Sequence, residues 1–521
     1  MEPITAAGLD AWLETLSQRR SHWAETPVGE RLQLLQRLRQ DTFRVAPRWA
    51  EVCSRLKGLD PKGQLAGEEW LVGPFITLRN LRLLESQLQS PLRDGGRVVR
   101  AIPGDTWDMV QWPVFRGETW TQPGTEPFLP VRGQLGLVLG AGNISSIGAT
   151  DVLYKMFIED QVVLLKMNPV HEALGPVLEE AFACLIERDY LKIVSGGAAE
   201  GALACQHPLV GAIHVTGSHH TYQAIRRSSD RPITAELGCC SPVIVAPGRW
   251  SSRQINFQAR NLVGALTTNA GFNCNAAQVL VTSRQWPQRQ QFLDEVRRVL
   301  AKVPARPAYY PGAGQRHAQI LDRYSQAEQI GPPGPDALPW TLVPDLDPDQ
   351  DQWAFSHEAF CGALFETSLD VPYPEYLMQA TDFANRRLWG NLSCTLVISP
   401  ESQKTQPWRR AVEELRYGAI GVNVWPGLIF ALVNLPWGAY PGNEPEDIQS
   451  GVGFVHNTAN ASGVEKCILK GPFYLPLRLP WQPGYTRSLA VARALATFEH
   501  EPGWKNALRC HWELLRGGFG M

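Results

Sequence analysis

A single cysteine, Cys274, stands in the segment TTNAGFNCNA. Around the thiol lie residues that supply amides and backbone freedom: Asn269, Gly271, Asn273 and Asn275. A cysteine is a nucleophile only as the thiolate, so it needs an approachable loop and a group that accepts its proton. We therefore take Cys274 as a candidate nucleophile. The alternative is an ordinary buried thiol that packs as a small apolar side chain.

Three further polar residues stand near the ends of predicted strands. The apolar run LGLVL predicts a buried strand that ends in GAGN, whose last residue is Asn143. VVLLK predicts another strand, which ends at Lys166, and TAELGCCSP contains Glu236, 38 residues before the cysteine (274 − 236 = 38). Taken singly, each has a plain alternative, as a turn residue, a surface lysine or a solvated strand-end carboxylate. Together with Cys274 they form a candidate site.

Strand-like and helix-like segments alternate along the middle of the chain. Strands are predicted at LGLVL, VVLLK, LKIV, GAIHV, VIVA and QVLVT, and helices over 174–187 and 253–266. This alternation predicts an α/β fold with parallel sheets covered by helices. The first ~95 residues predict helices. The Pro- and Asp-rich stretch 331–350 predicts a surface loop.

Composition and charge exclude several classes of protein. A chain of 521 residues predicts two or three domains. The net charge of −2 predicts neither a nucleic-acid nor a membrane partner. No run of apolar residues is long enough to span a bilayer, and the first residues lack the features of a secretory signal. Ten scattered cysteines without a CxxC pair predict a cytoplasmic protein with no disulfide framework and no metal site.

The segment NAGFNC resembles the nucleophile motif of the aldehyde dehydrogenase superfamily, Asn-x-Gly-x-x-Cys. Seven other segments resemble the family's remaining motifs, in the same order, between about residues 100 and 470: GAGN, LLKMNP, HVTGSHH, TAELGCCSP, HEAFCG, AIGVNVW and PWGAYPGN. Each match is modest by itself, and their common order makes a chance match improbable.

The resemblance implies a role for each matched residue. Cys274 would be the nucleophile, Glu236 the general base and Asn143 the side-chain donor of the oxyanion hole. Five residues would bind NAD or NADP, at the adenine ribose, the pyrophosphate, the nicotinamide ribose and the nicotinamide: Lys166, Gly217, Ser218, Glu358 and Phe360.

The implied reaction oxidises an aldehyde to a carboxylic acid through a cysteine thiohemiacetal and a thioester. One alternative passes the acyl group to or from coenzyme A, and GAGN in place of the family's Pro-Trp-Asn favours it. Glu236 argues against that alternative, because a thioester meant for coenzyme A should be kept from activated water. A second alternative is a non-catalytic member retained as a binding protein.

The implied architecture has a Rossmann-type cofactor domain, an α/β catalytic domain and a small β element for oligomerisation. The cofactor domain would comprise 1–97 and 132–240, and the catalytic domain 241–445. Strands in 98–131 and 464–476 would build a homodimer or homotetramer, and 477–521 would be a C-terminal extension of unknown role.

Several positions depart from the family pattern and mark a divergent member. Tyr222 stands where the family has a glycine near the cofactor pyrophosphate, which puts that geometry in question. Pro169 stands where NAD-preferring members often carry a glutamate, so NADP is as plausible as NAD. The vicinal Cys239 and Cys240 follow Glu236, and a structural role is favoured for both.

Overall fold

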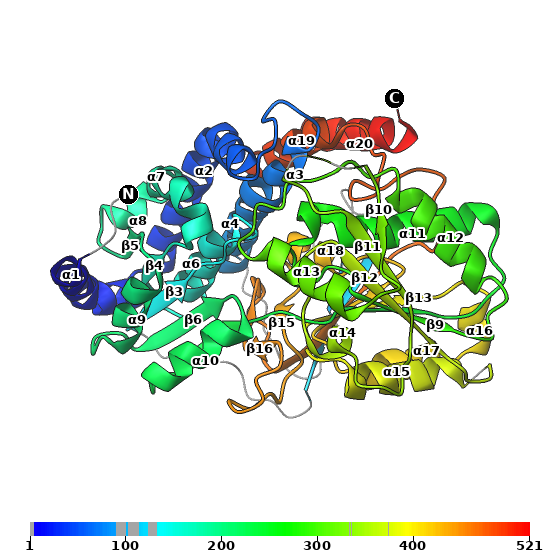
Figure 1. Ribbon diagram of the computed structural model, residues 1–521. Coiled ribbons are helices and arrows are strands. Elements are labelled where there is room, and N and C mark those ends of the chain that lie inside the picture. The colour runs from blue at the N-terminus through cyan, green and yellow to red at the C-terminus, as the bar shows by residue number, and fades with distance from the viewer. Residues whose placement is uncertain are drawn as a thin grey trace.

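The fold is built on two sheets with helices packed against them (Figure 1). The computed structural model describes residues 5–89, 100–102, 114–122, 133–332, 334, 336–373 and 375–520. This is the predicted α/β architecture, and most of the neighbouring strands run parallel. Within the described ranges, no helix is both long and apolar enough to cross a membrane.

The smaller sheet has six strands in the order β16-β7-β6-β3-β4-β5. All neighbours are parallel except β16, which joins β7 antiparallel. Every residue of β4 is buried, as expected for an apolar run inside a parallel sheet. The strands are β3 (Gln134–Leu139), β4 (Gln161–Lys166), β5 (Leu191–Val194), β6 (Ala212–Thr216), β7 (Ile233–Glu236) and β16 (Gly451–Val452).

The helix predicted over 174–187 is interrupted. A 3₁₀ turn precedes it, and the helical stretch divides at Phe182, whose backbone (φ −107°, ψ 15°) leaves the helical region while its ring is buried. The helices that lie between the strands of the smaller sheet in the sequence are α6 (Ile147–Phe157), α7 (Gly175–Ala181), α8 (Ala183–Ile186), α9 (Ala198–Gln206) and α10 (His219–Ser228).

The larger sheet has ten strands in the order β1-β2-β18-β14-β13-β8-β9-β12-β11-β10. The seven strands from β18 to β11 are parallel, and the outer ones join antiparallel. The strands are β1 (Arg100–Ile102), β2 (Arg116–Thr121), β8 (Pro242–Val245), β9 (Val279–Ser283), β10 (Glu328–Ile330), β11 (Trp340–Leu346), β12 (Ala363–Leu369), β13 (Ser393–Val397), β14 (Ala419–Val422) and β18 (Val464–Lys470).

The helices that accompany the larger sheet lie in the right half of Figure 1. They are α11 (Ser252–Thr267), α12 (Arg289–Leu300), α13 (Ala313–Arg323), α14 (Trp353–Ser356), α15 (Tyr376–Arg387), α16 (Ser402–Thr405), α17 (Trp408–Glu414) and α18 (Gly427–Leu432). A separate antiparallel pair is formed by β15 (Trp437–Gly438) and β17 (Phe454–Val455).

The prediction of a surface loop over residues 331–350 is wrong for the second half of that segment. Residues 340–346 form β11, which pairs parallel with β12 and antiparallel with β10. Its first residues, Trp340 to Val343, are buried, and the ladder shifts register between Val343 and Leu346. That irregularity accommodates Pro344, which cannot donate to a regular ladder. The flanking Pro and Asp residues therefore concealed a short apolar strand.

The described strands of the predicted oligomerisation element pair with other strands of the same chain. β18 lies between β2 and β14 of the same sheet. Most of the predicted segment 98–131 lies outside the residues that the structure describes, apart from β1, β2 and their immediate neighbours. A role of these strands in a dimer or tetramer stays a prediction.

The N-terminal helices and the C-terminal extension pack together. In Figure 1, α19 and α20 lie along the top of the molecule, and α3 lies next to α19. The elements are α1 (Ala6–Glu25), α2 (Val28–Leu56), α3 (Ala66–Trp70), a π-helical turn (Leu71–Phe75), α4 (Ile76–Gln89), α19 (Ser488–His500) and α20 (Trp504–Phe519). A buried ion-pair cluster joins α19 to α4, with Glu499 bound to Arg79 at 2.9 Å and to Arg82 at 2.5 Å.

Glu499→Gln is expected to lower the free energy of unfolding by about 3–5 kcal/mol, because Arg79 and Arg82 lose a carboxylate partner in the interior. Burial acts to raise the pKa of Glu499, and Arg82 and Arg79 outweigh it, so the pKa is lowered. The stabilisation is therefore present above the unfolded carboxyl pKa of about 4.3 and is lost as the pH falls through the folded value. Denaturant titration measures both effects. In the control variant Glu414→Gln, which loses an exposed pair with Arg410, the change should stay below about 1 kcal/mol.

Candidate active site

The three predicted catalytic residues, from separate elements, lie close together. Asn143 follows β3, Glu236 is the last residue of β7, and Cys274 lies in the loop before β9. The side-chain Nδ2 of Asn143 donates to the carbonyl of Phe272 at 3.1 Å, which ties the β3 loop to the cysteine loop. Glu236 is close enough to Cys274 for its charge to raise the pKa of the thiol.

Cys274 differs from every other cysteine of the chain in its exposure. All ten cysteines are free thiols, and Cys274 alone is not buried. The vicinal Cys239 and Cys240 are among these free thiols, and both are buried. Burial raises the pKa of the Cys274 thiol well above its usual range, and Glu236, Glu358 and Cys239 add to the shift. The thiol is therefore protonated at neutral pH and needs a base to become a nucleophile.

Glu236 has the features of such a base. Its side chain is buried, and its Oε1 atom has no hydrogen-bond partner among the residues that the structure describes. Burial raises the pKa of this carboxyl well above its usual range, and Asp151 raises it further, while Trp437 acts in the opposite direction. A buried carboxylate with a raised pKa and an unpartnered oxygen is well suited to accept a proton.

The loop that carries Cys274 has an unusual backbone. Asn269, Ala270 and Gly271 have φ values of 53°, 56° and 82°, so three consecutive residues are left-handed. Each such non-glycine residue typically costs on the order of 1 kcal/mol or more, so surrounding contacts must hold it. At Gly271 an added Cβ would lie 2.8 Å from the backbone of Cys361, which explains the glycine of NAGFNC.

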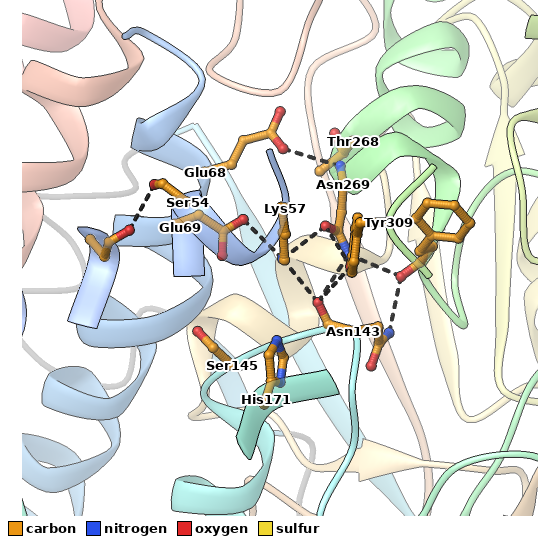
Figure 2. A network of polar contacts seen from close by, with 12 residues as sticks. Ser54, Lys57, Glu68, Glu69, Asn143, Ser145, His171, Thr268, Asn269 and Tyr309 are labelled. Atoms are coloured by element: carbon orange, nitrogen blue, oxygen red, sulfur yellow. Dashed lines mark hydrogen bonds and ion pairs between the residues drawn. The ribbon is translucent and has the colours of Figure 1, made fainter. Parts of the chain in front are cut away.

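A buried polar network holds this strained loop against the Asn143 loop (Figure 2). Lys57 Nζ donates to the side-chain oxygen of Asn269 at 2.9 Å and to the backbone carbonyl of Asn143 at 3.0 Å. The Tyr309 hydroxyl donates to the same two oxygens at 3.1 and 3.2 Å. Asn269 Nδ2 also donates to the Asn143 carbonyl, at 3.1 Å. The two loops therefore share one set of donors.

The N-terminal helices supply the charges of this network. Glu69 pairs with Lys57 at 2.9 Å, and both are buried. Burial acts to lower the pKa of Lys57, and Glu69 and Tyr309 outweigh it, so the pKa is raised and the ammonium keeps its charge. Glu68 accepts the backbone N–H of Asn269 at 3.1 Å and two bonds from Arg306 at 2.9 and 3.0 Å.

Sequence reasoning missed Lys57 and Tyr309, which donate to the Asn143 and Asn269 loops in this network. Lys57 lies 86 residues before Asn143 and 212 before Asn269, and it follows a helix in a region without any chemical motif. Tyr309 stands in an ordinary loop segment, AYYPG. No spacing in the sequence connects these positions.

The predicted pyrophosphate residues lie at the start of α10. Ser218 is the N-cap, and its Oγ accepts the backbone N–H of Thr221 at 3.2 Å. Gly217 and Ser218 are exposed, and the N-terminus of a helix favours phosphate groups. Tyr222 does not obstruct this loop, because its side chain is buried in the core. Lys166, at the end of β4, is buried, and burial lowers its pKa, with Glu200 acting in the opposite direction.

The predicted nicotinamide residues flank the cysteine loop. The Glu358 carboxylate lies over Gly238, where an added Cβ would come within 2.0 Å of Oε2. Burial raises the pKa of Glu358 to about 8. The Phe360 ring packs on Phe272, with ring centroids 5.8 Å apart. Among the described residues, no group of three or more His, Cys, Asp or Glu side chains is arranged to hold a metal ion.

Part of the sequence resembles known aldehyde dehydrogenases. The sequence model of the aldehyde dehydrogenase family matches residues 161–320, which include Lys166, Glu236 and Cys274. One curated relative is the N-succinylglutamate 5-semialdehyde dehydrogenase of Novosphingobium aromaticivorans, 25% identical over 171 residues. That match spans 32% of this chain and about a third, 35%, of the relative.

Solved structures extend the likeness over nearly the whole chain. The NADP-dependent glyceraldehyde-3-phosphate dehydrogenase of Bacillus halodurans C-125, complexed with NADP, is 15% identical with a TM-score of 0.65, covering 90% of this chain and 92% of that one. Aldehyde dehydrogenase C of Pseudomonas syringae, complexed with NAD+ and octanal, is 15% identical with a TM-score of 0.63, covering 91% and 90%. The family model thus matches about a third of the chain, and the solved structures show that nearly the whole chain shares the fold of aldehyde dehydrogenases.

Proposed function

We propose that this protein oxidises an aldehyde to a carboxylic acid, with NAD or NADP as the hydride acceptor. The observation that carries the proposal is the meeting of Cys274, Glu236 and Asn143 from three separate elements. The plain alternatives for these residues leave two features unexplained: the sole thiol that is not buried, and a buried carboxylate oxygen without a partner.

Each of the three residues has a defined part in the reaction. Glu236 takes the proton of Cys274, and the thiolate sulfur then attacks the aldehyde carbonyl to give a thiohemiacetal. A carboxamide has two N–H bonds, so Asn143 can hold the Phe272 carbonyl with one and stabilise the oxyanion with the other. After oxidation to the thioester, Glu236 activates a water that releases the acid.

A bound nicotinamide cofactor supplies the hydride acceptor, and the residues present fit such a group. The exposed N-terminus of α10 at Gly217 and Ser218 suits a pyrophosphate. Lys166 ends β4, and β3 separates that strand from β6, the strand that precedes α10. Glu358 and Phe360, beside the cysteine loop, suit the nicotinamide end. With Pro169 in place of an acidic residue, the 2′-phosphate of NADP meets no carboxylate at that position.

The proposal is tested with purified protein, a panel of aldehydes, and NAD or NADP, with and without coenzyme A. Reduced cofactor formed without coenzyme A supports it. Strict dependence on coenzyme A would favour an acyl-CoA reductase instead, and a protein that neither binds cofactor nor turns over would be a non-catalytic member. A cytoplasmic homodimer or homotetramer stays part of the proposal, and sedimentation of the full chain tests the assembly.

Lys57→Met is expected to lower kcat by about ten- to a hundredfold, because the Asn143 and Asn269 loops lose a shared donor and the oxyanion donors are no longer held in place. Cofactor affinity should change little, since the predicted cofactor residues lie on other loops. Steady-state kinetics and cofactor titration measure the two quantities. The double variant Lys57→Met, Glu69→Gln also removes the carboxylate that the single change leaves buried and unpaired.

The matched control is Lys192→Met, which removes a lysine from a partly exposed pair with Asp189. Its kcat should equal that of the unaltered protein. If the Lys57 variants fold and keep full kcat, the network does not position the oxyanion donors.

A further inference from the structure

The α20 helix carries large apolar side chains on its outward face. Leu508, Trp512, Leu515 and Phe519 are 68%, 59%, 45% and 56% exposed. Their spacing of four, three and four residues places them in one stripe along the helix. Figure 1 shows α20 on the outside of the molecule, next to α19. A continuous stripe of this kind marks an interaction surface, unlike single exposed apolar residues.

The other face of α20 fixes this orientation. Small residues face the protein and are buried: Ala507, Cys510, Gly517 and Gly518. At Gly517 an added Cβ would come within 2.4 Å of the Tyr485 ring, so the helix is seated closely there. The Tyr485 hydroxyl donates to the Leu514 carbonyl at 3.1 Å. The backbone N–H of Arg478 donates to the Gly518 carbonyl at 3.0 Å. The helix is anchored by its small residues and presents its large ones outward.

A row of cations borders the stripe. At 100° per residue, Lys505, Arg509 and Arg516 follow each other along one side of it. The Arg516 guanidinium lies 5.8 Å from the Trp512 ring, which connects the row to the stripe. The acidic residue of this helix, Glu513, is bound to Arg487 at 2.6 Å. A second copy of the helix would therefore bring no carboxylate for the row, whereas anionic lipid headgroups would complement it.

We propose that α20 binds peripherally to a lipid bilayer that contains anionic headgroups. Leu508, Trp512, Leu515 and Phe519 enter the boundary between headgroups and acyl chains, and Lys505 and Arg509 meet the phosphates. Trp is favoured at this depth because its ring is apolar and its N–H is polar. This revises the sequence-based expectation of no membrane partner, which considered only the whole-chain charge and long apolar runs. It does not depend on the proposed enzymatic function.

The test is co-sedimentation of the full chain with phosphatidylcholine vesicles, with and without phosphatidylglycerol. Binding is expected to the anionic vesicles and to weaken with added salt. Trp512→Ser with Phe519→Ser should lower the binding at least about tenfold. Lys505→Gln with Arg509→Gln should abolish the preference for anionic vesicles. All these side chains are exposed, so circular dichroism should show an unchanged fold.

The matched control is Leu203→Ser, which removes a Leu that is 49% exposed on α9. It should bind vesicles as the unaltered protein does. Equal binding by the control and by the Trp512 and Phe519 double variant would overturn the proposal, and so would no binding to anionic vesicles. The stripe would instead be assigned to a second copy of the chain under two conditions. The unaltered protein would be a dimer by light scattering that only the stripe variants convert to monomers, and it would not bind vesicles.

Discussion

Replacing Cys274 by serine is expected to abolish aldehyde-dependent cofactor reduction, with a loss of at least about a thousandfold in kcat. The hydroxyl is a far weaker acid than the thiol, so Glu236 cannot generate a comparable nucleophile from it. The side chain is nearly isosteric and half-buried, so the fold and cofactor binding should persist. Stopped-flow absorbance of the reduced nicotinamide measures the loss.

Cys184→Ser is the matched control for this change. Cys184 is a free thiol, and it is buried on α8 away from the loops of the site. Its kcat should be unchanged within error. If the Cys274 variant retained turnover comparable to this control, the nucleophile would have to be another residue.

The second large effect is expected for Glu236→Gln. Steady-state turnover should fall by about a hundredfold or more, because no carboxylate remains to activate the water that releases the acid. One burst of cofactor reduction should survive, since the fraction of thiol ionised by solvent still allows a single, slower attack. Rapid mixing separates the burst from the steady rate. Unchanged rates in both phases would remove Glu236 from the mechanism.

The pH dependence of kcat follows from the same carboxyl. A base acts in its ionised form, and burial together with Asp151 raises the pKa of Glu236. The unaltered protein should therefore lose activity as the pH falls through this raised value and gain it as the pH rises. In Glu236→Gln the corresponding rise of the slow steady rate should be absent. A profile of kcat against pH for both proteins makes the comparison.

Much of the fold was predictable because buried parallel strands are short continuous apolar runs. LGLVL, VVLLK and QVLVT correspond to β3, β4 and β9 within one residue at each end. The helix over 253–266 was likewise expected, since α11 has apolar residues on one face and a polar N-cap, Ser251. β11 escaped because its apolar run is only four residues long, between two prolines.

The candidate site was only partly predictable. Residues at strand ends in recognisable motifs, such as Asn143 and Glu236, were found because the strands position them. Lys57 and Tyr309 were not, because their contacts depend on how distant segments pack. The left-handed run before Cys274 was also hidden, since Asn and Gly indicate backbone freedom without giving its sign. The sequence left the effect of Tyr222 on the pyrophosphate geometry open, and the structure places its side chain in the core.

The most direct test of the account is to observe the acyl group on the sulfur. Glu236→Gln is mixed with an aldehyde substrate and NAD or NADP, quenched during the burst, digested and examined by mass spectrometry. The account predicts that the peptide containing Cys274 gains the mass of the acyl group in proportion to reduced cofactor. Reduced cofactor with an unmodified Cys274 peptide, or with the acyl group on another residue, would contradict it.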